Sequence, residues 1–159
     1  FSSRRRHTRY IRVTGVQTCA LPISCTAQDG TVYALLRGGN ALVAVKDGKV
    51  NVVVNKAGKK GPATDGPAAE ATMNGPKYVT MDAKGDVLIL DTENHCLRVY
   101  DPAKQTIRTL VGNGKKGAAV GADWSGTQLN RPHGARIGPD GRLYVTDTEN
   151  NRILVGPAA

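Results

Sequence analysis

The sequence predicts an all-β protein built from a repeated unit of short antiparallel strands. Two motifs recur at one spacing, glycine is abundant while aromatic residues are few, and the apolar runs are short. Met73-Asn74-Gly75-Pro76 recurs as Leu129-Asn130-Arg131-Pro132, and Asp91-Thr92-Glu93-Asn94 recurs unchanged as Asp147-Thr148-Glu149-Asn150, in both cases 56 residues later. A fixed period of this length is typical of architectures in which each repeat is one supersecondary unit.

The first 24 residues are left out of this prediction because they resemble translated sequencing adapter. Codons that fit residues 3–9 and 13–23 reproduce, in order and in one frame, the two fixed halves of a common short-read library adapter. We expect residues 1–24 to be non-native and disordered, and the domain to span residues 25–159. Leaving them out removes five arginines and no acid, so the net charge falls from +9 to +4. An Arg-rich nucleic-acid arm or targeting signal is therefore not inferred.

The remaining chain has the length of one domain. No run approaches the ~18 consecutive apolar residues that a membrane-spanning helix needs. Two cysteines remain, Cys25 and Cys96, and they form neither a disulfide framework nor a metal-ligand spacing. These features leave the cellular compartment open.

The middle copy of the repeat predicts four strands, approximately over residues 77–82, 87–90, 96–100 and 106–111. Each run is rich in apolar and β-branched residues and ends at a cluster of Gly, Pro, Asp or Asn, which is the pattern of a strand bounded by turns. Helical periodicity is absent except weakly over residues 68–73.

The copies on either side are expected to be incomplete. The first, over residues 29–56, begins at its second strand, and the last, over residues 129–155, shows three strands beside the complete copy at 73–112. Four antiparallel strands per unit, repeated radially, form the blades of a β-propeller. The sequence therefore predicts a partial β-propeller of about two and a half four-stranded blades.

These residues resemble the NHL-repeat β-propeller family. The shared pattern is N-x-P at 74–76 and 130–132, an x-D-G turn near a strand, the D-T-x-N turn and a closing V-G-x-G at 111–114. The loop over 58–76 is similar to the inter-blade loop of a bacterial subset of that family. The resemblance implies a complete propeller of six blades, of which this chain is a truncated C-terminal part with Ala159 near the natural end. It also implies a secreted or periplasmic location.

A basic rim is expected on one face of the propeller. The turn between the second and third strands of a blade and the connection to the next blade emerge on the same face, and binding residues concentrate on such loops. The candidates for ligand contact there are Lys59, Lys60, Lys115, Lys116, Arg131, His133 and Trp124. They predict binding of a protein, peptide or anionic ligand, and the alternative is a solvated loop face. Nucleic acid is weakly supported, because Trp124 is the only loop aromatic on which a base could stack.

The repeated turn residues are expected to be structural. Asp91, Asn94, Asp147 and Asn150 have short side chains that accept hydrogen bonds from backbone N–H groups one to three residues on, which closes a tight turn. Their repetition in successive blades favours this role over that of metal or substrate ligands.

We infer no metal, cofactor or catalytic residue. His133 begins an innermost strand, where related enzymes place metal-binding histidines, but the equivalent residue of the middle copy is Lys77, and one histidine makes no zinc site. His95 is expected at the surface and Cys96 in the core. Residues 112–117 fit G-x-G-x-x-G, but no helix is predicted after them, as a dinucleotide site requires.

The leading functional hypothesis is a binding or scaffold module that presents its loops rigidly. A metal-dependent propeller enzyme of the lactonase or amidating-lyase type is the main alternative, and a sensor domain of a larger receptor is the third. Inward-facing acids and histidines at the starts of the innermost strands would mark the enzyme. Those positions hold Lys77, Tyr78 and His133. Fold resemblance alone does not separate these functions.

Overall fold

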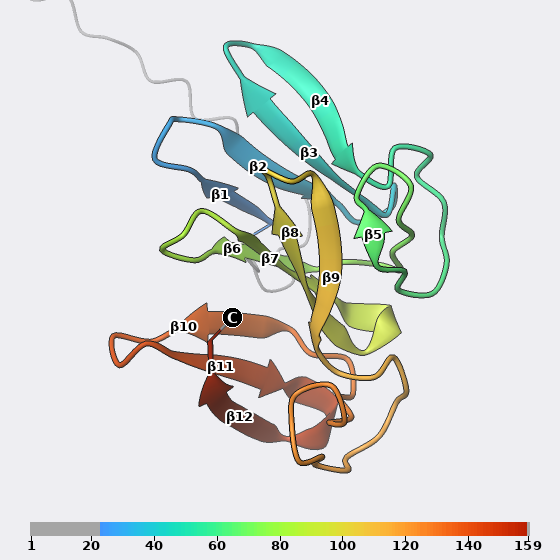
Figure 1. Cartoon of the computed structure of the whole chain (residues 1–159). Helices are drawn as coiled ribbons and strands as arrows, with labels where there is room; N and C mark the ends of the chain where they lie inside the picture. The colour runs from blue at the N-terminus through green and yellow to red at the C-terminus, as the bar shows by residue number, and fades with distance from the viewer. Residues whose placement is uncertain (1–22, 159) are drawn as a thin grey trace, which may run out of the picture.

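The computed structural model describes residues 23–158, so the expectation for the adapter-like residues 1–22 lies outside it. Three antiparallel sheets follow one another along the chain, and Figure 1 shows them stacked, the first coloured blue to teal and the last orange to red. The strands are β1 (Ser24–Thr26), β2 (Val32–Leu36), β3 (Ala41–Lys46) and β4 (Lys49–Val54) in the first sheet; β6 (Tyr78–Met81), β7 (Val87–Asp91), β8 (Cys96–Asp101) and β9 (Thr106–Val111) in the second; and β10 (Gly134–Ile137), β11 (Arg142–Asp147) and β12 (Arg152–Pro157) in the third. Each sheet is a propeller blade, which confirms the predicted all-β fold class.

The first blade has all four strands, so the prediction that it begins at its second strand is wrong. Strand β1 pairs antiparallel with β2, with Ser24 opposite Ala34 and Thr26 opposite Val32. It starts one residue inside the segment assigned to the adapter. Three residues are too few to show the alternation typical of a strand. Strand β1 is therefore defined by its pairing with β2 and not by its own sequence pattern.

The second blade gains a fifth strand that was not expected. Strand β5 (Gly66–Pro67) lies in the inter-blade loop and pairs antiparallel with the outer edge of β9, with Gly66 opposite Ile107. Proline has no N–H to offer a further strand, so Pro67 suits the edge of a sheet. This pairing covers part of the edge and holds the loop against the blade.

The repeated D-T-E-N segment forms a short turn in both copies. After β7 and β11 the chain makes the 3-10 helices η1 (Thr92–Asn94) and η2 (Thr148–Asn150). They end at His95 and Asn151, whose φ angles of 53° and 51° are left-handed. The identical sequence thus gives nearly the same backbone at one end of the second and third blades.

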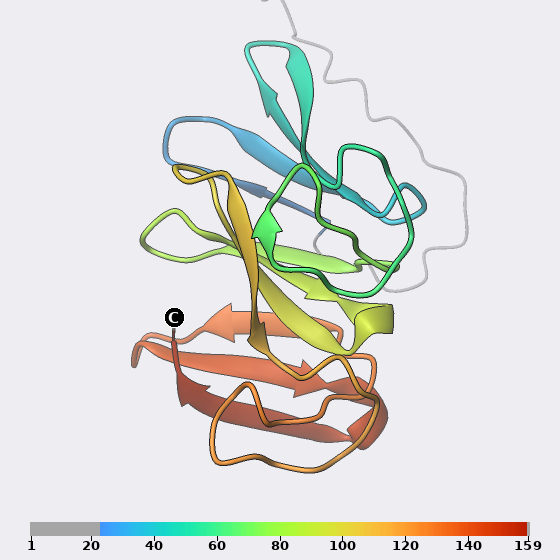
Figure 2. The same ribbon diagram turned by 45° about the vertical axis from the view of Figure 1, so that its right-hand side comes forward.

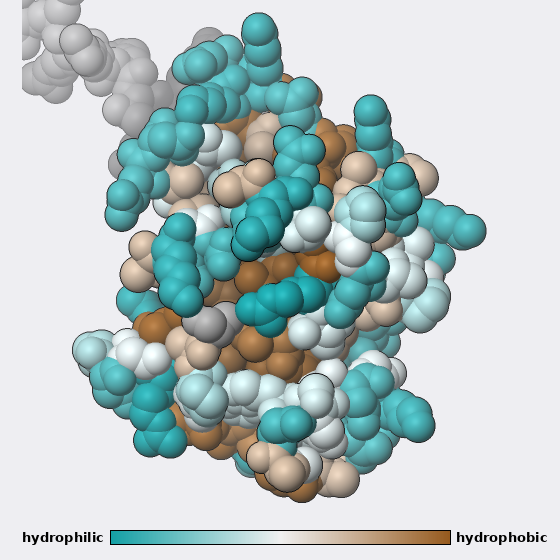
Figure 3. Space-filling view, in the orientation of Figure 1, coloured by the Kyte–Doolittle hydropathy of each residue, from teal (hydrophilic) through white to brown (hydrophobic). Residues whose placement is uncertain are grey.

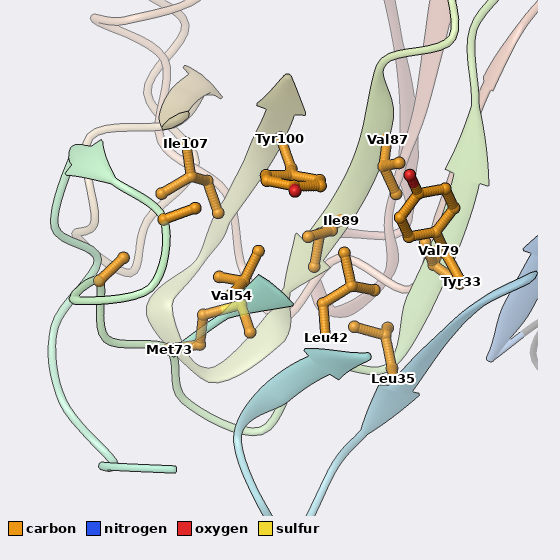
Figure 4. Close-up of a cluster of buried hydrophobic side chains, with 12 residues drawn as sticks. Tyr33, Leu35, Leu42, Val54, Met73, Val79, Val87, Ile89, Tyr100 and Ile107 are labelled. Carbon is orange, nitrogen blue, oxygen red and sulfur yellow. The ribbon is translucent and has the colours of Figure 1, made fainter. Parts of the chain in front are cut away.

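The core lies between the blades. Leu42 and Val54 of the first blade pack with Val79 and Ile89 of the second, as Figure 4 shows. In the same layer the rings of Tyr33 and Tyr100 pack edge to face, with their centroids 6.3 Å apart. Such burial and ring geometry stabilise the stacking of one blade on the next.

The middle blade is covered on both faces. Strand β7 directs Val87 and Ile89 toward the first blade and Leu88 and Leu90 toward the third, where Leu143 joins them. All five residues of β7 are buried, which explains its continuous apolar sequence. The outward faces of the end blades instead carry exposed apolar side chains, among them Leu36, Val50, Val52, Tyr144, Ile153 and Val155. Within residues 23–158, no helix is long and apolar enough to span a membrane.

Candidate functional site

Loops from all three blades gather at one end of the molecule. Figures 1 and 2 both show the green inter-blade loop beside the η1 turn. The Asn94 amide donates to the Gly61 carbonyl at 3.0 Å, and the Asn150 amide donates to the Gly117 carbonyl at 2.7 Å. This confirms that the turns and the inter-blade loops meet. We call this end the loop face, made of residues 37–40, 55–77, 91–95, 112–133 and 147–151.

The turn aspartates Asp91 and Asp147 hold the inter-blade loops through hydrogen bonds, and their backbone partners differ from the turn N–H groups that the sequence predicted. One oxygen of Asp91 accepts the backbone N–H of Asn74 at 2.7 Å, and the other accepts the Asn94 amide at 2.8 Å. Asp147 bonds the backbone N–H of Asn130 in the same way, also at 2.7 Å. The backbone partner is therefore in the preceding inter-blade loop, 17 residues away, and not in the turn itself. Each aspartate joins a turn to a loop, which no local motif could reveal.

A fully buried arginine strengthens this link in the second blade. The Arg98 guanidinium donates to the Thr64 and Thr72 carbonyls of the inter-blade loop at 2.5 and 3.4 Å. It also lies 3.6 Å from Asp91 and 3.2 Å from Asp65. Burial raises the pKa of Asp91 to about 6, even though hydrogen bonds from Asn94, the backbone and Arg98 favour its charged form.

The third blade makes an equivalent link from another position. Arg152 donates to Asp147 at 2.7 Å and to the carbonyls of Ala118 and Gln128 at 2.8 and 2.9 Å. Arg98 is the third residue of β8, whereas Arg152 is the first residue of β12. The two arginines therefore do not occupy equivalent positions of the repeat, and the sequence pattern revealed neither of them.

A charged cluster occupies the inner side of the loop face. One oxygen of Glu93 lies 2.8 Å from Arg131 and 3.3 Å from Lys77, and the Lys77 ammonium is 3.3 Å from Nε2 of His133. Burial would raise the pKa of Glu93, but the hydrogen bonds from Arg131 and Lys77 lower it below its usual value. Two predicted binding residues, Arg131 and His133, are therefore engaged within the protein.

Both histidines of this region favour the neutral form. Burial, followed by the nearby Lys77 and Arg131 charges, lowers the pKa of His133. Burial also lowers the pKa of His95, whose Nδ1 accepts the backbone N–H of Arg131 at 3.1 Å. His95 was expected at the surface, but it is half-buried and joins the second blade to the loop that precedes the third.

We expect His95→Asn to reduce the loss of stability on acidification. A depressed histidine pKa leaves stability intact above the unfolded-state value of 6.5 and removes it as the pH falls through the folded-state value. Asn40 and Asn151 occupy the corresponding positions of the other blades, so asparagine fits this backbone and does not titrate. The measurement is the free energy of unfolding at about pH 7.5 and about pH 5.5. An equal loss in both proteins would exclude a contribution from His95.

The predicted lysines remain exposed. Lys59, Lys60, Lys115 and Lys116 are solvent-accessible, and no ion pair within residues 23–158 involves any of them. On the side where Figure 1 places the inter-blade loops, Figure 3 shows hydrophilic side chains projecting outward. The two loops thus carry unneutralised positive charge on a firmly anchored backbone.

Trp124 packs against its own protein. Its indole N–H donates to the Pro157 carbonyl at 2.9 Å, and its ring lies where a side chain on Gly156 would be. The ring is half-buried and contacts the second core cluster. Its polar group is consequently used in joining the inter-blade loop to β12.

A polar hollow of about 640 Å³ opens on the loop face between the first two blades. It is lined by Arg37, Gly38, Asn40, Lys60, Asn74, Gly75 and Glu93. Arg37 was missed in the sequence because the first copy lacks the D-T-E-N signature that marks this turn in the others. In the described part of the chain, no group of three or more His, Cys, Asp or Glu side chains is placed to hold a metal ion.

Blades stacked around inter-blade cores, with loops collected at one end, define a β-propeller protein. The NHL-repeat family model matches residues 73–100 and 129–155, which are the second and third copies of the repeat. The chain belongs to the NHL-repeat proteins. The blade number of a complete propeller stays a prediction.

Similar proteins are longer than this chain. NHL repeat-containing protein 2 of Bos taurus is 34% identical over 122 residues, which cover 71% of this chain and 16% of that protein. Protein SUPPRESSOR OF QUENCHING 1, chloroplastic, of Arabidopsis thaliana is 34% identical over 119 residues, 75% of this chain and 11% of that protein. An auxiliary nutrient binding protein from Bacteroides thetaiotaomicron has a TM-score of 0.72 at 21% identity, over 84% of this chain and 36% of that one, and shares the fold.

Proposed function

We propose that this propeller is a rigid binding module whose loop face holds an acidic stretch of a protein or peptide. The observation that carries the proposal is the set of exposed, unpaired lysines on the two inter-blade loops. Lys59 and Lys60 lie on the first loop, and Lys115 and Lys116 lie on the second. Clustered charge of one sign attracts ligands of the opposite sign and accelerates their association.

The anchoring of the loops favours binding. Arg98 and Asp91 hold the first loop, and Arg152 and Asp147 hold the second. A loop that is already ordered loses little conformational entropy when a ligand arrives, so more of the contact energy appears as affinity. The lysine side chains therefore project from a backbone that hydrogen bonds already hold.

Peptide is favoured over nucleic acid by the placement of Trp124. Single-stranded nucleic acids are usually held by bases stacked on aromatic rings as well as by positive charge. The Trp124 indole packs against β12 and donates to Pro157, and the loop face offers charge without another loop aromatic in the described residues.

The test is a charge-reversal variant of the full chain. We expect the joint change of Lys59, Lys60, Lys115 and Lys116 to Glu to weaken binding of a labelled, glutamate-rich peptide by about tenfold or more at low salt. Fluorescence anisotropy measures the affinity, and added salt should weaken binding to the original chain because it screens exposed charges.

A matched variant controls for net charge. It changes Lys49, Lys84, Arg108 and Arg142 to Glu, all outside the loop face, and should keep most of the affinity. Equal weakening in both variants would show that general charge, and not the loop face, attracts the peptide. Tighter binding of a single-stranded oligonucleotide than of the peptide would replace the proposed ligand.

A further inference from the structure

The two junctions between blades can be compared residue by residue, because the repeat places equivalent groups in each. Asn40 and His95 both have left-handed φ angles, 49° and 53°. Asn40 accepts the backbone N–H of Gly75 at 2.9 Å, just as His95 accepts that of Arg131 at 3.1 Å. Counting back from Asn40 and His95, Gly38 therefore corresponds to Glu93, and Gly75 corresponds to Arg131.

In the junction between the second and third blades these positions hold an ion pair. The Arg131 guanidinium donates to the Glu93 carboxylate at 2.8 Å. A guanidinium and a carboxylate at this distance form a charge-assisted hydrogen bond. The geometry of the junction thus accommodates a carboxylate beside a cationic group.

In the junction between the first and second blades both positions are glycine. Neither Gly38 nor Gly75 carries a side chain, and the junction is the open hollow of about 640 Å³. A Cβ on Gly75 would lie 2.9 Å from Cγ of Glu93, so this position has no room for a larger residue without a shift of that side chain. The space is of the size that small-molecule or side-chain ligands occupy.

The hollow has unpaired donors. Arg37 and Lys60 line it, and neither forms an ion pair with an acid in the described residues. The Asn40 side chain uses its oxygen for Gly75, which leaves its amide N–H groups available. Glu93 is the only acid in the lining, and it already bonds Arg131 and Lys77. The hollow therefore has surplus positive charge.

We propose that this hollow binds a carboxylate of the ligand against Arg37 and Lys60, in the place that the Glu93 carboxylate takes in the next junction. The inference rests on the proposed function and deepens it by naming the chemical group and the residues that receive it. An aspartate or glutamate side chain of a peptide supplies the carboxylate, and a small free acid such as succinate offers the same chemistry.

The sharpest test places a carboxylate in the hollow from within. Gly38→Glu adds, at the position equivalent to Glu93, the group that the ligand would otherwise bring. A side chain is tolerated there, because the φ of Gly38 is not left-handed and no atom lies within 4 Å of its Cβ position. We expect Gly38→Glu to weaken binding of succinate and of the glutamate-rich peptide by about tenfold, measured by calorimetry on the full chain.

Two further variants control the result. Ala103→Glu adds the same side chain and charge at an exposed position outside the loop face and should keep the affinity within about twofold. The double variant Arg37→Gln, Lys60→Gln removes the receiving cations and should weaken binding as much as Gly38→Glu does. Urea denaturation of each variant verifies that the fold is retained.

The outcomes separate this inference from the proposed function. If the peptide binds and neither Gly38→Glu nor the double variant weakens it, the hollow is not the site, while the lysine-dependent binding stands. If Ala103→Glu weakens binding as much as Gly38→Glu does, added negative charge anywhere on the chain is decisive, and the inference fails. Competition by inorganic phosphate at lower concentration than succinate would also overturn the carboxylate assignment. Binding of succinate without the peptide supports the hollow as a carboxylate site and contradicts the proposed peptide ligand.

Discussion

Replacement of Arg98 by Met is expected to lower the free energy of unfolding by about 3 kcal/mol at about pH 8. The Arg98 side chain is fully buried, and the change leaves the buried Asp91 carboxylate without its cation. It also leaves the Thr64 and Thr72 carbonyls without their donor. Urea denaturation followed by circular dichroism measures the effect.

The cost should depend on pH in a definite direction. Because the pKa of Asp91 is about 6, this group is largely neutral at about pH 5, and loss of Arg98 then leaves no unpaired buried charge, since its other partner, Asp65, is exposed. The destabilisation should therefore be smaller at about pH 5 than at about pH 8. Arg108→Met, at an exposed position of the neighbouring strand, should change stability by less than about 0.5 kcal/mol. A cost for Arg98→Met that is the same at both pH values would contradict the role of the Asp91 charge.

We expect Gly112→Ala to be about as damaging, with a cost of about 3 kcal/mol or more. Gly112 has a φ of 100°, and an added Cβ would lie 2.6 Å from the His95 carbonyl oxygen and 3.0 Å from Cα of Cys96. Its backbone N–H also bonds the Trp124 carbonyl at 3.0 Å. The substitution therefore forces apart the start of β8 and the inter-blade loop.

Gly114→Ala is the matched control. Gly114 lies in the same loop and has a φ of 75°, but nothing lies within 4 Å of its Cβ position. Its substitution carries only the conformational strain, about 1 kcal/mol. Thermal unfolding of both variants separates strain from collision. Equal costs would mean that the approach of residue 112 to β8 is not tight.

The fold was largely predictable because the same motifs and turn residues occur in two copies of the repeat. The four strands of the middle blade lie within one residue of their predicted ends, and the D-T-E-N copies form identical turns. Strands β1 and β5 were missed. Each is too short to carry a pattern, and each exists because a neighbouring strand offers it hydrogen bonds.

The candidate site was predictable in part. The gathering of the loops follows from blade topology, and the exposed lysines follow from composition. Arg98 and Arg152 were missed because they reach the equivalent turns of two blades from different strand positions. Arg37 was missed because the first copy lacks the D-T-E-N signature, so the sequence did not show that Gly38 and Gly75 leave open beside it a space that their counterparts fill.

The sequence by itself determined the blade, since apolar alternation and turn residues act over a few neighbours and recur at a fixed period. Only the tertiary structure decided which loop each turn aspartate holds and which cation Glu93 meets, because the Asp91–Asn74 and Glu93–Arg131 bonds join residues 17 and 38 positions apart in the chain. Arg131, predicted to contact a ligand, is paired with Glu93, whereas Arg37 faces an open hollow. Ion pairs depend on distance in space. A repeat pattern predicts that distance only for residues that recur in every copy.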